Sequence, residues 1–170
     1  MTAGEHDGDP VFVVQHHLAT ADHYDVRFEI DGVLVSWAVP KGPSTDPSVR
    51  RLAKRTGDHA LEYQSYEGVL GPRRGGGTVQ VWDHGTFRNV SNRRGVPITA
   101  GQALADGHLS VDVDGQKLTG RFTLIRTGGE DLWLLIKRSG PGADPALDVT
   151  AARPESVLTG RTMAEIAEQG

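Results

Sequence analysis

Short stretches in which apolar and polar residues alternate recur along the chain and predict β-strands. The alternation is clearest in His23–Ile30, where successive side chains of an extended strand would point to opposite faces. One face would carry His, Asp, Arg and Glu, and the other Tyr, Val, Phe and Ile. Strands are predicted at Val11–Gln15, His23–Ile30, Val33–Val39, Thr78–Asp83, Leu109–Val113, Lys117–Ile125 and Leu132–Lys137.

Two features predict how the first strands are connected. Asp31-Gly32 separates the second and third strands, which is a strong signal for a two-residue hairpin turn. Asp46 followed by Pro47 is typical of a helix N-terminus. It predicts a short helix over Ser48–Arg55 that ends at Gly57.

Helices elsewhere are also predicted to be short. Thr99 with Gln102 and Thr162 with Glu165 both resemble capping boxes, and the first would open a helix that stops at Gly107. Many short strands with few helices favour a barrel or sandwich over a parallel α/β sheet. The predicted fold class is therefore mainly β, a compact closed or partly open β-barrel with a few short helices.

The bulk properties fit one domain with a mild negative charge. The chain has 170 residues and a formal net charge of −4. This charge argues against a protein that coats long stretches of nucleic acid, but it permits a compact site that grips one strand end. Basic residues cluster locally, although such runs are most often solvated faces. The clusters are Arg50-Arg51 with Lys54-Arg55, Arg73-Arg74 and Arg93-Arg94.

The chain contains no cysteine, which excludes disulfides and thiolate metal sites and fits a reducing compartment. Its apolar runs are too short to span a bilayer, and residues 1–10 are polar and acidic rather than like a signal peptide. We therefore expect a soluble, cytoplasmic protein that has no membrane partner.

Four polar residues in and before the second predicted strand form a candidate site. His23, Asp25 and Arg27 would share one face of the strand, and His17 lies six residues upstream of His23, within reach over a short loop. Two imidazoles and a carboxylate are suitable ligands for a divalent metal, and a guanidinium can hold a phosphate through paired hydrogen bonds. The same alternation is also typical of an ordinary half-buried strand with polar groups facing water. The pattern therefore suggests phosphate-ester chemistry without establishing it.

A set of motifs carries more information together than any one of them does alone. They are Phe12–His17, His23–Glu29, Asp31–Leu34, Ser36–Pro43, Arg51–Ala53, Asp58–Tyr63, Tyr66–Gly68, Gly77–Val79, Val81–Asp83, Gly120–Leu124 and Trp133–Lys137. In combination they resemble the 3′-phosphoesterase domain of bacterial DNA ligase D, a repair enzyme of non-homologous end joining. The resemblance covers roughly residues 11–138. Since nothing in the chain resembles a ligase or a polymerase, it looks like a free-standing version of this domain.

The resemblance implies a metal-dependent hydrolase that heals the 3′ ends of DNA. Such a domain is expected to form a β-barrel, to remove a 3′-terminal ribonucleoside as a phosphodiesterase, and then to remove the resulting 3′-phosphate as a phosphomonoesterase. The implied cofactor is Mn²⁺, with Zn²⁺ or another divalent transition metal as alternatives. The implied partners are DNA or RNA–DNA primer-template 3′ ends and, in end joining, a ligase, a polymerase or Ku-type proteins. The expected form is a monomer in the cytoplasm, associated with the nucleoid.

The functional positions of the family carry over one by one. The residues implied to bind the metal are His17, His23 and Asp25. Those implied to act in catalysis are Arg27, His59 and Tyr63. Those implied to bind the substrate are Gln15, Lys41 and Arg51. Arg27 would counter the negative charge of the transition state. His59 would either donate a hydrogen bond to the phosphate or protonate the leaving oxygen, and the sequence leaves both roles open.

The predicted domain organisation has three parts. Residues 1–10 form a short N-terminal arm, residues 11–138 the 3′-phosphoesterase-like β-barrel, and residues 139–170 a loop and C-terminal helical segment packed on it. Two parts depart from the family pattern. The stretch Val69–Gly76 is shorter and more basic, typical of a loop that tracks a nucleic-acid backbone or of a plain flexible loop. The second departure is the N-terminal arm, which is commonly longer in the family and has only about ten residues here. If a longer arm assists the phosphomonoesterase step, we expect this chain to favour the diesterase step.

Two other functions fit parts of the pattern. An Fe(II)/2-oxoglutarate-type oxygenase on a β-barrel would use His23 and Asp25 with a distant histidine. In that case the third metal ligand would be His84 or His108, and Arg94 or Arg121 would bind the oxo-acid. A catalytically weak DNA-end-binding module would keep the barrel without turnover.

Overall fold

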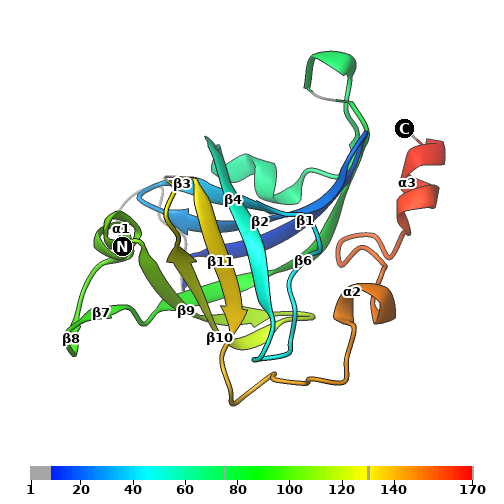
Figure 1. The fold of residues 1–170 in the computed structure, drawn as a ribbon. Coiled ribbons are helices and arrows are strands. Elements are labelled where there is room, and N and C mark those ends of the chain that lie inside the picture. Colours follow the sequence, from blue (N-terminus) through cyan, green and yellow to red (C-terminus); the bar gives the residue numbers. More distant parts are fainter. Residues whose placement is uncertain (1–8, 75, 130, 170) are drawn as a thin grey trace.

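Eight antiparallel strands close into a β-barrel (Figure 1). The structure is a computed structural model that describes residues 9–74, 76–129 and 131–169, so residues 1–8 of the predicted arm lie outside it. The strands follow the order β1-β2-β3-β4-β11-β10-β9-β6, and β6 pairs with β1 to close the barrel. They are β1 (Val11–Leu18), β2 (Asp22–Ile30), β3 (Val33–Val39), β4 (Arg50–His59), β6 (Thr78–Asn89), β9 (His108–Gly115), β10 (Thr119–Arg126) and β11 (Leu132–Lys137). The predicted fold class is confirmed.

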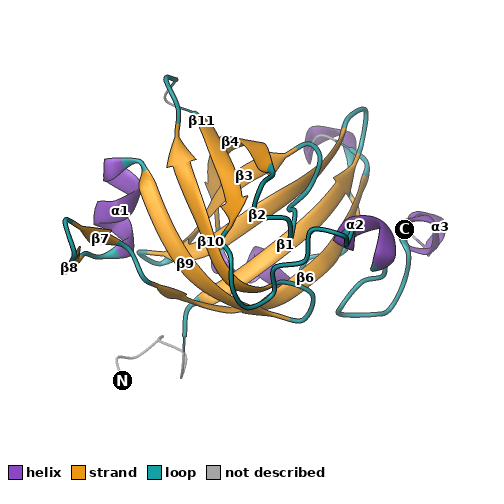
Figure 2. Cartoon of the chain, turned by 60° about the horizontal axis from the view of Figure 1, so that its bottom comes forward, coloured by secondary structure: helices purple, strands orange, loops and turns teal. Residues whose placement is uncertain are grey.

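The remaining elements lie outside the barrel wall (Figure 2). A short strand, β5 (Gly68–Val69), pairs with the end of β6, and β7 (Asn92–Arg93) pairs with β8 (Val96–Pro97). The helices are η1 (Leu61–Ser65), η2 (Pro72–Arg74), α1 (Ala100–Asp106), α2 (Val149–Ala152) and α3 (Met163–Gln169), where η marks a 3₁₀ helix. Among the described residues, no helix combines the length and apolar character needed to cross a lipid bilayer.

Apolar side chains from alternate strand positions fill the barrel. Trp37, Trp82 and Trp133 are fully buried, and the rings of Trp37 and Trp133 meet edge to face with 5.4 Å between their centroids. Phe28 packs edge to face against both Trp37 and Phe87. Burying each such side chain stabilises the fold by about 1.5–3 kcal/mol, so the interior is a packed core rather than a ligand cavity.

Local signals in the sequence position several elements correctly. Asp31 and Gly32 have φ values of 52° and 85°, as a two-residue hairpin turn requires, and they join β2 to β3. Thr99 and Gln102 form a reciprocal capping box at the start of α1. Thr162 makes the equivalent bonds with Glu165 at α3. These predictions are confirmed.

The helix predicted over Ser48–Arg55 is wrong, because residues 50–59 form strand β4 between β3 and β11. The Asp46 carboxylate accepts hydrogen bonds from the backbone and hydroxyl of Ser48, which closes a tight turn instead of capping a helix. Ala53 is fully buried in the barrel core. The barrel needs a strand here to pair with both neighbours, and this pairing outweighs the local helix signal.

Residues 153–161, named here the C-terminal strap, run across the barrel wall and are held by buried polar side chains. The indole N–H of Trp82 donates to the carbonyl of Arg153, and the side-chain amide of Gln80 donates to the carbonyls of Pro154 and Arg161. The Lys117 ammonium, whose side chain is fully buried, also donates to the Arg153 carbonyl. The strap is therefore an integral part of the folded domain.

Candidate metal and phosphate site

The candidate site lies on the outer face of the barrel, where β1 and β2 run antiparallel. The register places His17 opposite His23 and Gln15 opposite Asp25, and Arg27 follows two positions along β2. Because side chains alternate, these five share one face, while the apolar residues between them belong to the barrel core. The hairpin thus brings His17 back to His23, as the sequence predicts.

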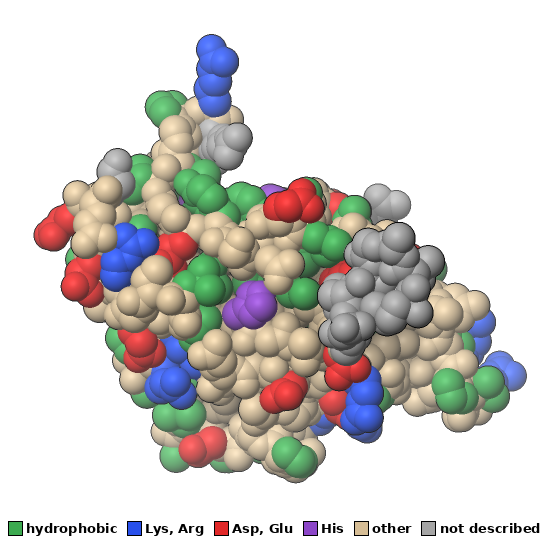
Figure 3. Space-filling view, turned by 180° about the vertical axis from the view of Figure 1, so that it is seen from behind, with side chains coloured by type: hydrophobic (Ala, Val, Ile, Leu, Met, Phe, Trp, Pro, Cys, Tyr) green, Lys and Arg blue, Asp and Glu red, His purple; other side chains and the backbone are tan. Residues whose placement is uncertain are grey.

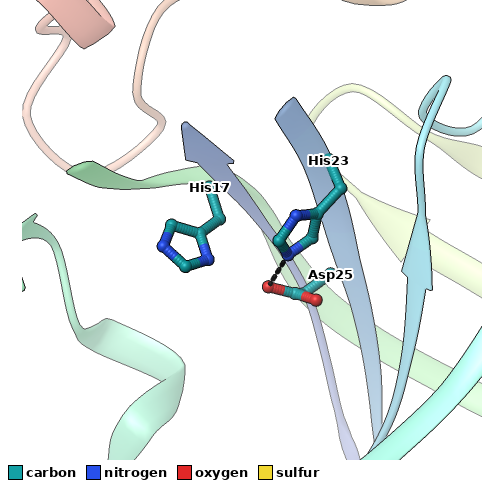
Figure 4. A group of neighbouring side chains, drawn as sticks. All are labelled: His17, His23 and Asp25. Carbon is teal, nitrogen blue, oxygen red and sulfur yellow. Dashed lines mark hydrogen bonds and ion pairs between the residues drawn. The ribbon is translucent and has the colours of Figure 1, made fainter. Parts of the chain in front are cut away.

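His17, His23 and Asp25 form a compact group of metal-ligand atoms (Figure 4). One ligand atom from each residue lies within 4.8 Å of the others, and His23 Nε2 is 3.1 Å from Asp25 Oδ2. Protein ligands sit about 2.0–2.2 Å from ions such as Zn²⁺, so two ligands of one ion are about 3 Å apart. The His23–Asp25 pair has this spacing. Two imidazoles and a carboxylate therefore fit a divalent transition metal such as Mn²⁺ or Zn²⁺.

The charges in this group reinforce one another. Burial raises the pKa of Asp25, but the hydrogen bond with His23 and the positive charge of Arg27 outweigh burial and hold that pKa below its usual value. The same hydrogen bond raises the pKa of His23 above its ordinary value. Asp25 is therefore ionised at neutral pH, and a proton competes with a cation for His23.

A backbone carbonyl orients His17. Its Nε2 lies 3.0 Å from the carbonyl oxygen of Gly76, in the loop between β5 and β6. A carbonyl only accepts, so this bond requires the proton on Nε2 and leaves the lone pair of Nδ1 for a cation. Figure 4 shows one ring nitrogen of His17 turned toward His23 and Asp25 and the other turned away.

Arg27 is almost fully buried, with 3% of its surface exposed, and its guanidinium is held on three sides. Nε donates to the side-chain oxygen of Gln15 at 2.7 Å, and Nη1 donates to the hydroxyl of Ser36 at 2.8 Å. Nη2 forms an ion pair with Asp25 at 3.4 Å. Since Nε and Nη1 are engaged, Nη2 is the part of the guanidinium that can bind an anion beside the metal ligands.

His59, the last residue of β4, contacts Arg27 through Nδ1, which is 3.1 Å from Nη1. The same Nδ1 is 3.1 Å from the carbonyl of Gly57. The first contact needs an unprotonated Nδ1 and the second a protonated one, so one neutral tautomer makes only one of them. Burial and then the Arg27 charge lower the pKa of His59, which favours the neutral ring. When Nδ1 accepts from Arg27, the Nε2–H is available to donate to a substrate.

The 3₁₀ helix η1 covers this centre. The ring of Tyr63 lies over the Arg27 guanidinium at 5.1 Å and contacts the His59 ring at 4.9 Å. The prediction that His59 and Tyr63 share a face of one extended segment is wrong about the backbone, because β4 ends and η1 begins between them. Gln15, which is fully buried, donates to the carbonyls of Tyr63 and Tyr66 and so links Arg27 to η1.

Two predicted substrate-binding residues make no contact with Arg27 within the described residues. Lys41 is exposed in the turn after β3 and makes no hydrogen bond or ion pair within the described residues. Arg51 lines a cavity of about 270 Å³ between the turn at Ser44 and the segment at Leu147. Its Nε is buried without a hydrogen-bond partner in the described part of the chain. The structure therefore does not bring Lys41 or Arg51 to the Arg27 guanidinium.

The histidines of the oxygenase alternative also lie elsewhere. His84 Nε2 is 2.8 Å from the side-chain oxygen of Gln64, and His108 begins β9 on another part of the wall. Arg121 is paired with Asp112 at 2.8 Å. In the part of the chain that the structure describes, the third member of the ligand group is His17.

Sequence reasoning missed three contributors to the site, namely Ser36, Tyr66 and Gly76. Ser36 is opposite Arg27 in the β2–β3 ladder, so strand register would have found it. Gly76 belongs to the run Gly75–Gly77, and its φ of 67° is one that glycine adopts without strain. Tyr66 stacks on Tyr63, and the only hint of this contact in the sequence is that the two tyrosines are three positions apart.

This barrel places a possible metal-ligand group beside a buried arginine, and these are residue types that enzymes acting on phosphate groups use. The sequence profile of the DNA Ligase D 3′-phosphoesterase domain matches residues 15–126. The chain therefore belongs to this family of phosphoesterase hydrolases, and the resemblance noted in the sequence is confirmed.

Several proteins named as multifunctional in non-homologous end joining contain a similar segment. The "Multifunctional non-homologous end joining protein LigD" of Pseudomonas aeruginosa is 44% identical over 158 residues, which is 89% of this chain and 18% of that protein. The "Multifunctional non-homologous end joining DNA repair protein LigD" of Mycobacterium tuberculosis is 44% identical over 129 residues, 75% of this chain and 16% of that protein. LigD of Mycolicibacterium smegmatis is 37% identical over 146 residues, 85% of this chain and 18% of that protein. The chain thus spans less than a fifth of the length of these relatives.

Proposed function

We propose that this chain is a divalent-metal-dependent phosphoesterase that heals the 3′ ends of DNA. The observation that carries the proposal is the ion pair between Arg27 Nη2 and Asp25 at the edge of the His17–His23–Asp25 group. A cation and a phosphate would meet between these residues. The reactions are removal of a 3′-terminal ribonucleoside by phosphodiesterase action and removal of the remaining 3′-phosphate by phosphomonoesterase action.

His17, His23 and Asp25 are the proposed ligands of Mn²⁺, or of Zn²⁺ or another divalent transition metal. When bound, such an ion polarises a phosphoryl oxygen and lowers the pKa of a bound water. The ionised carboxylate of Asp25 and the Nδ1 lone pair of His17 are the groups prepared for it. A carbonyl behind His17 and a guanidinium behind Asp25 support these ligands, as outer-shell partners commonly do.

The neighbouring residues act on the phosphate. Arg27 binds a non-bridging oxygen through Nη2 and stabilises the negative charge that grows there in the transition state. His59 donates its Nε2–H to the phosphate or to the leaving oxygen. Tyr63 covers both groups with its ring and limits the access of water. Gln15 fixes Arg27 from beneath.

Lys41 and Arg51 are proposed to serve the nucleic-acid strand away from the centre. Lys41 is exposed beyond the end of the β2–β3 ladder that carries His23, where a long ammonium side chain can reach a backbone phosphate. Arg51 is proposed because it matches a family position and because its guanidinium Nε is buried without a partner in the described chain.

The biological setting follows from the names of the relatives. Proteins named for non-homologous end joining carry a similar segment, so we place the substrate at DNA or RNA–DNA primer-template 3′ ends in that process. A ligase, a polymerase or Ku-type proteins are the proposed partners, and the nucleoid in the cytoplasm is the proposed location. Residues 11–138 are the proposed catalytic domain, which would act as a monomer with residues 139–169 packed on it.

The direct test uses a 5′-labelled DNA primer annealed to a template and ending in one ribonucleotide. With Mn²⁺ the protein should shorten this primer by one nucleoside and leave a 3′-phosphate, and EDTA or Asp25→Ala should stop the reaction. His108→Gln, which changes a histidine outside the group, should remain active. Tight binding without shortening in any of Mn²⁺, Zn²⁺, Co²⁺ and Mg²⁺ would contradict the proposal and favour an end-binding module.

A second substrate separates the two reactions. A primer that already ends in a 3′-phosphate should be converted to a 3′-hydroxyl, and EDTA should stop this conversion too. Cleavage of the ribonucleotide primer without any conversion of the 3′-phosphate primer would contradict the phosphomonoesterase step and leave the phosphodiesterase in place.

A further inference from the structure

A column of planar groups extends outward from the buried arginine. The Arg27 guanidinium lies 5.1 Å from the centre of the Tyr63 ring, and the Tyr66 ring is stacked on Tyr63 with 5.2 Å between centroids and 14° between planes. His59 touches Tyr63 from the side at 4.9 Å. The column therefore begins at the group that would hold a phosphate and ends at Tyr66.

Packing of the core does not account for Tyr66. The part of Tyr63 nearest the barrel joins a small cluster built on Val13, Leu34 and Val81, but Tyr66 belongs to neither apolar cluster of the described chain. Tyr66 remains partly exposed, and η1, which precedes it, contains no buried residue. An aromatic ring left at the surface beside a polar centre is a common feature of ligand sites.

Tyr66 is nevertheless held firmly in place. Its hydroxyl donates to the carbonyl of Val69, its amide donates to the carbonyl of Tyr63, and its carbonyl accepts from the side-chain amide of Gln15. One ring face rests on Tyr63. Little conformational freedom is therefore left to lose on binding, and the exposed part of the ring is a preformed flat surface.

We infer that Tyr66 is a stacking platform for the nucleobase of the 3′-terminal nucleoside, the one that the proposed reaction releases. This inference rests on the proposed function and adds a base-binding subsite to it. The Tyr63 ring already has the Arg27 guanidinium and the Tyr66 ring against it, so we place the base on the side of Tyr66 that faces away from Tyr63. A terminal nucleoside has a stacking neighbour on one side only, which makes it the easiest base of the strand to move onto a protein ring.

The surroundings suit a single strand that leaves this subsite. Beyond Tyr66 the chain enters β5 and the hairpin that carries the exposed Arg73. Figure 3 shows a projection that ends in a basic side chain, above a face where a histidine lies among apolar and uncharged side chains. Single-strand binding sites commonly combine basic groups, which hold the backbone, with aromatic rings, which stack on any base.

The test compares three substitutions of Tyr66 on two primers. One primer ends in a ribonucleotide, and the matched primer ends in the same ribose without a base. Tyr66→Leu keeps apolar bulk but removes the flat ring, Tyr66→Phe keeps the ring but removes the hydroxyl, and Tyr66→Ala removes both. Ser65→Ala, at an exposed neighbour that bonds only to the carbonyl of Glu62, is the control. KM and kcat are measured with Mn²⁺, and the dissociation constant is measured by fluorescence anisotropy in EDTA.

Tyr66→Leu and Tyr66→Ala should raise KM and the dissociation constant for the base-bearing primer about 5- to 100-fold, with kcat changed far less. Tyr66→Phe, which keeps the ring, should lose far less than Tyr66→Leu, and Ser65→Ala should behave like the parent protein. The primer without a terminal base should bind the parent protein as weakly as the base-bearing primer binds Tyr66→Leu, and should be indifferent to substitution. A parent preference for a terminal purine over a pyrimidine should disappear in Tyr66→Leu.

Two results would overturn the inference: unchanged binding of the base-bearing primer by a folded Tyr66→Leu variant, or an equal loss on both primers. Matching thermal midpoints of Tyr66→Leu and the parent protein ensure that a loss is not due to unfolding. If the parent protein cuts neither primer, the proposed function fails, while the anisotropy experiment in EDTA still decides whether Tyr66 binds a base.

Discussion

Arg27 shows why the identity of a single side chain matters at this site. One guanidinium bonds to Gln15 and Ser36, pairs with Asp25 and lies against the ring of Tyr63. These contacts use different edges and a face of the same planar group, and an ammonium has no such geometry. A lysine at position 27 would keep the positive charge but could not make all of these contacts.

Arg27→Lys should lower kcat/KM about 10²- to 10³-fold, because the phosphate loses the Nη2 donor that is aimed at it. It should also destabilise the protein by about 1–3 kcal/mol, since buried acceptors on Gln15 and Ser36 lose their donor. Metal affinity should stay close to the parent value. The measurements are primer cleavage, urea unfolding and calorimetric titration of Mn²⁺.

A matched control is Arg126→Lys, at an arginine that also lies over an aromatic ring, 5.7 Å from that of Trp133, but outside the site. It should keep near-parental activity. If Arg27→Lys cuts the primer at the parental rate, the guanidinium has no special role in phosphate binding.

The raised pKa of His23 predicts a pH dependence of metal binding. Asp25 stabilises the protonated imidazole of His23, so its pKa lies above the ordinary value of 6.5. A cation needs the unprotonated ring, and protons therefore displace it as the pH falls through this raised pKa. Affinity for Mn²⁺ should be constant at higher pH and should fall about tenfold per pH unit below the pKa. Calorimetric titration between pH 6 and 8.5 measures this, and a flat profile would remove His23 from the ligand group.

At the scale of elements, the β5–β6 hairpin connects the site to the C-terminal strap. The Gly76 carbonyl in the hairpin loop orients His17, and Glu67, just before β5, is the anchor of the strap. The Glu67 carboxylate accepts from the hydroxyls of Ser156 and Thr159, each at 2.6 Å, and pairs with Arg161 at 3.1 Å. Only 4% of the Glu67 side chain is exposed. A segment beyond the family match is thereby connected to the edge of the barrel that carries the candidate metal ligands.

Glu67→Gln should destabilise the protein at pH 7 by about 1–3 kcal/mol, because a neutral amide cannot satisfy four donors. Burial raises the pKa of Glu67, but its hydrogen bonds outweigh burial and lower that pKa below 4.5. A lowered carboxyl pKa gives stability that is present above the ordinary value and lost as the pH falls through the lowered one. The stability difference between variant and parent should therefore shrink toward pH 3.

Urea unfolding at several pH values measures the stability difference, and limited trypsin digestion at Arg161 measures how firmly the strap is held. Glu168→Gln, which neutralises an exposed carboxylate on α3, should match the parent protein in both. A Glu67→Gln variant as stable and as resistant to trypsin as the parent would show that the strap does not depend on this anchor.

At the scale of the whole molecule, a cation that binds the native state should stabilise the fold. A ligand present at 100 times its dissociation constant adds about 2.7 kcal/mol, which for a domain of this size raises the thermal midpoint by about 5–10 °C. Mn²⁺ should produce such a shift in the parent protein and in His108→Gln, and EDTA should reverse it. His17→Ala and Asp25→Asn should remain folded without showing the shift. An equal shift in all four proteins would place the ion elsewhere.

Several elements of the fold could be predicted from the sequence. Three of the correct predictions rest on local features, namely the alternation in β2 and β3, the two-residue turn between them and the capping box at α1. Such features can be predicted from neighbouring residues alone. It failed at β4, where Arg50–His59 has a helix-like start and an irregular burial pattern. That segment is a strand because β3 and β11 each present an edge to it.

The site likewise contains residues that local spacing places and residues that only the fold places. A hairpin of known period is enough to place His17, His23, Asp25 and Arg27 on one face. His59 and Tyr63 were named through family resemblance, but their contacts with Arg27 depend on β4 and η1 folding over the hairpin. Lys41 and Arg51 matched family positions equally well, but neither contacts Arg27 within the described residues, so their roles stay predictions.

The chain by itself thus determined the strand-rich class, the family and the candidate ligand pair on β2, since these follow from short-range spacing and side-chain chemistry. Tertiary structure alone decided which donors of Arg27 stay available, that the Gly76 carbonyl orients His17, and that Tyr66 completes a column of rings. The reason is physical: hydrogen-bond partners and ring contacts depend on distances between segments far apart in sequence. Only closure of the barrel and the folding of η1 over its wall set those distances.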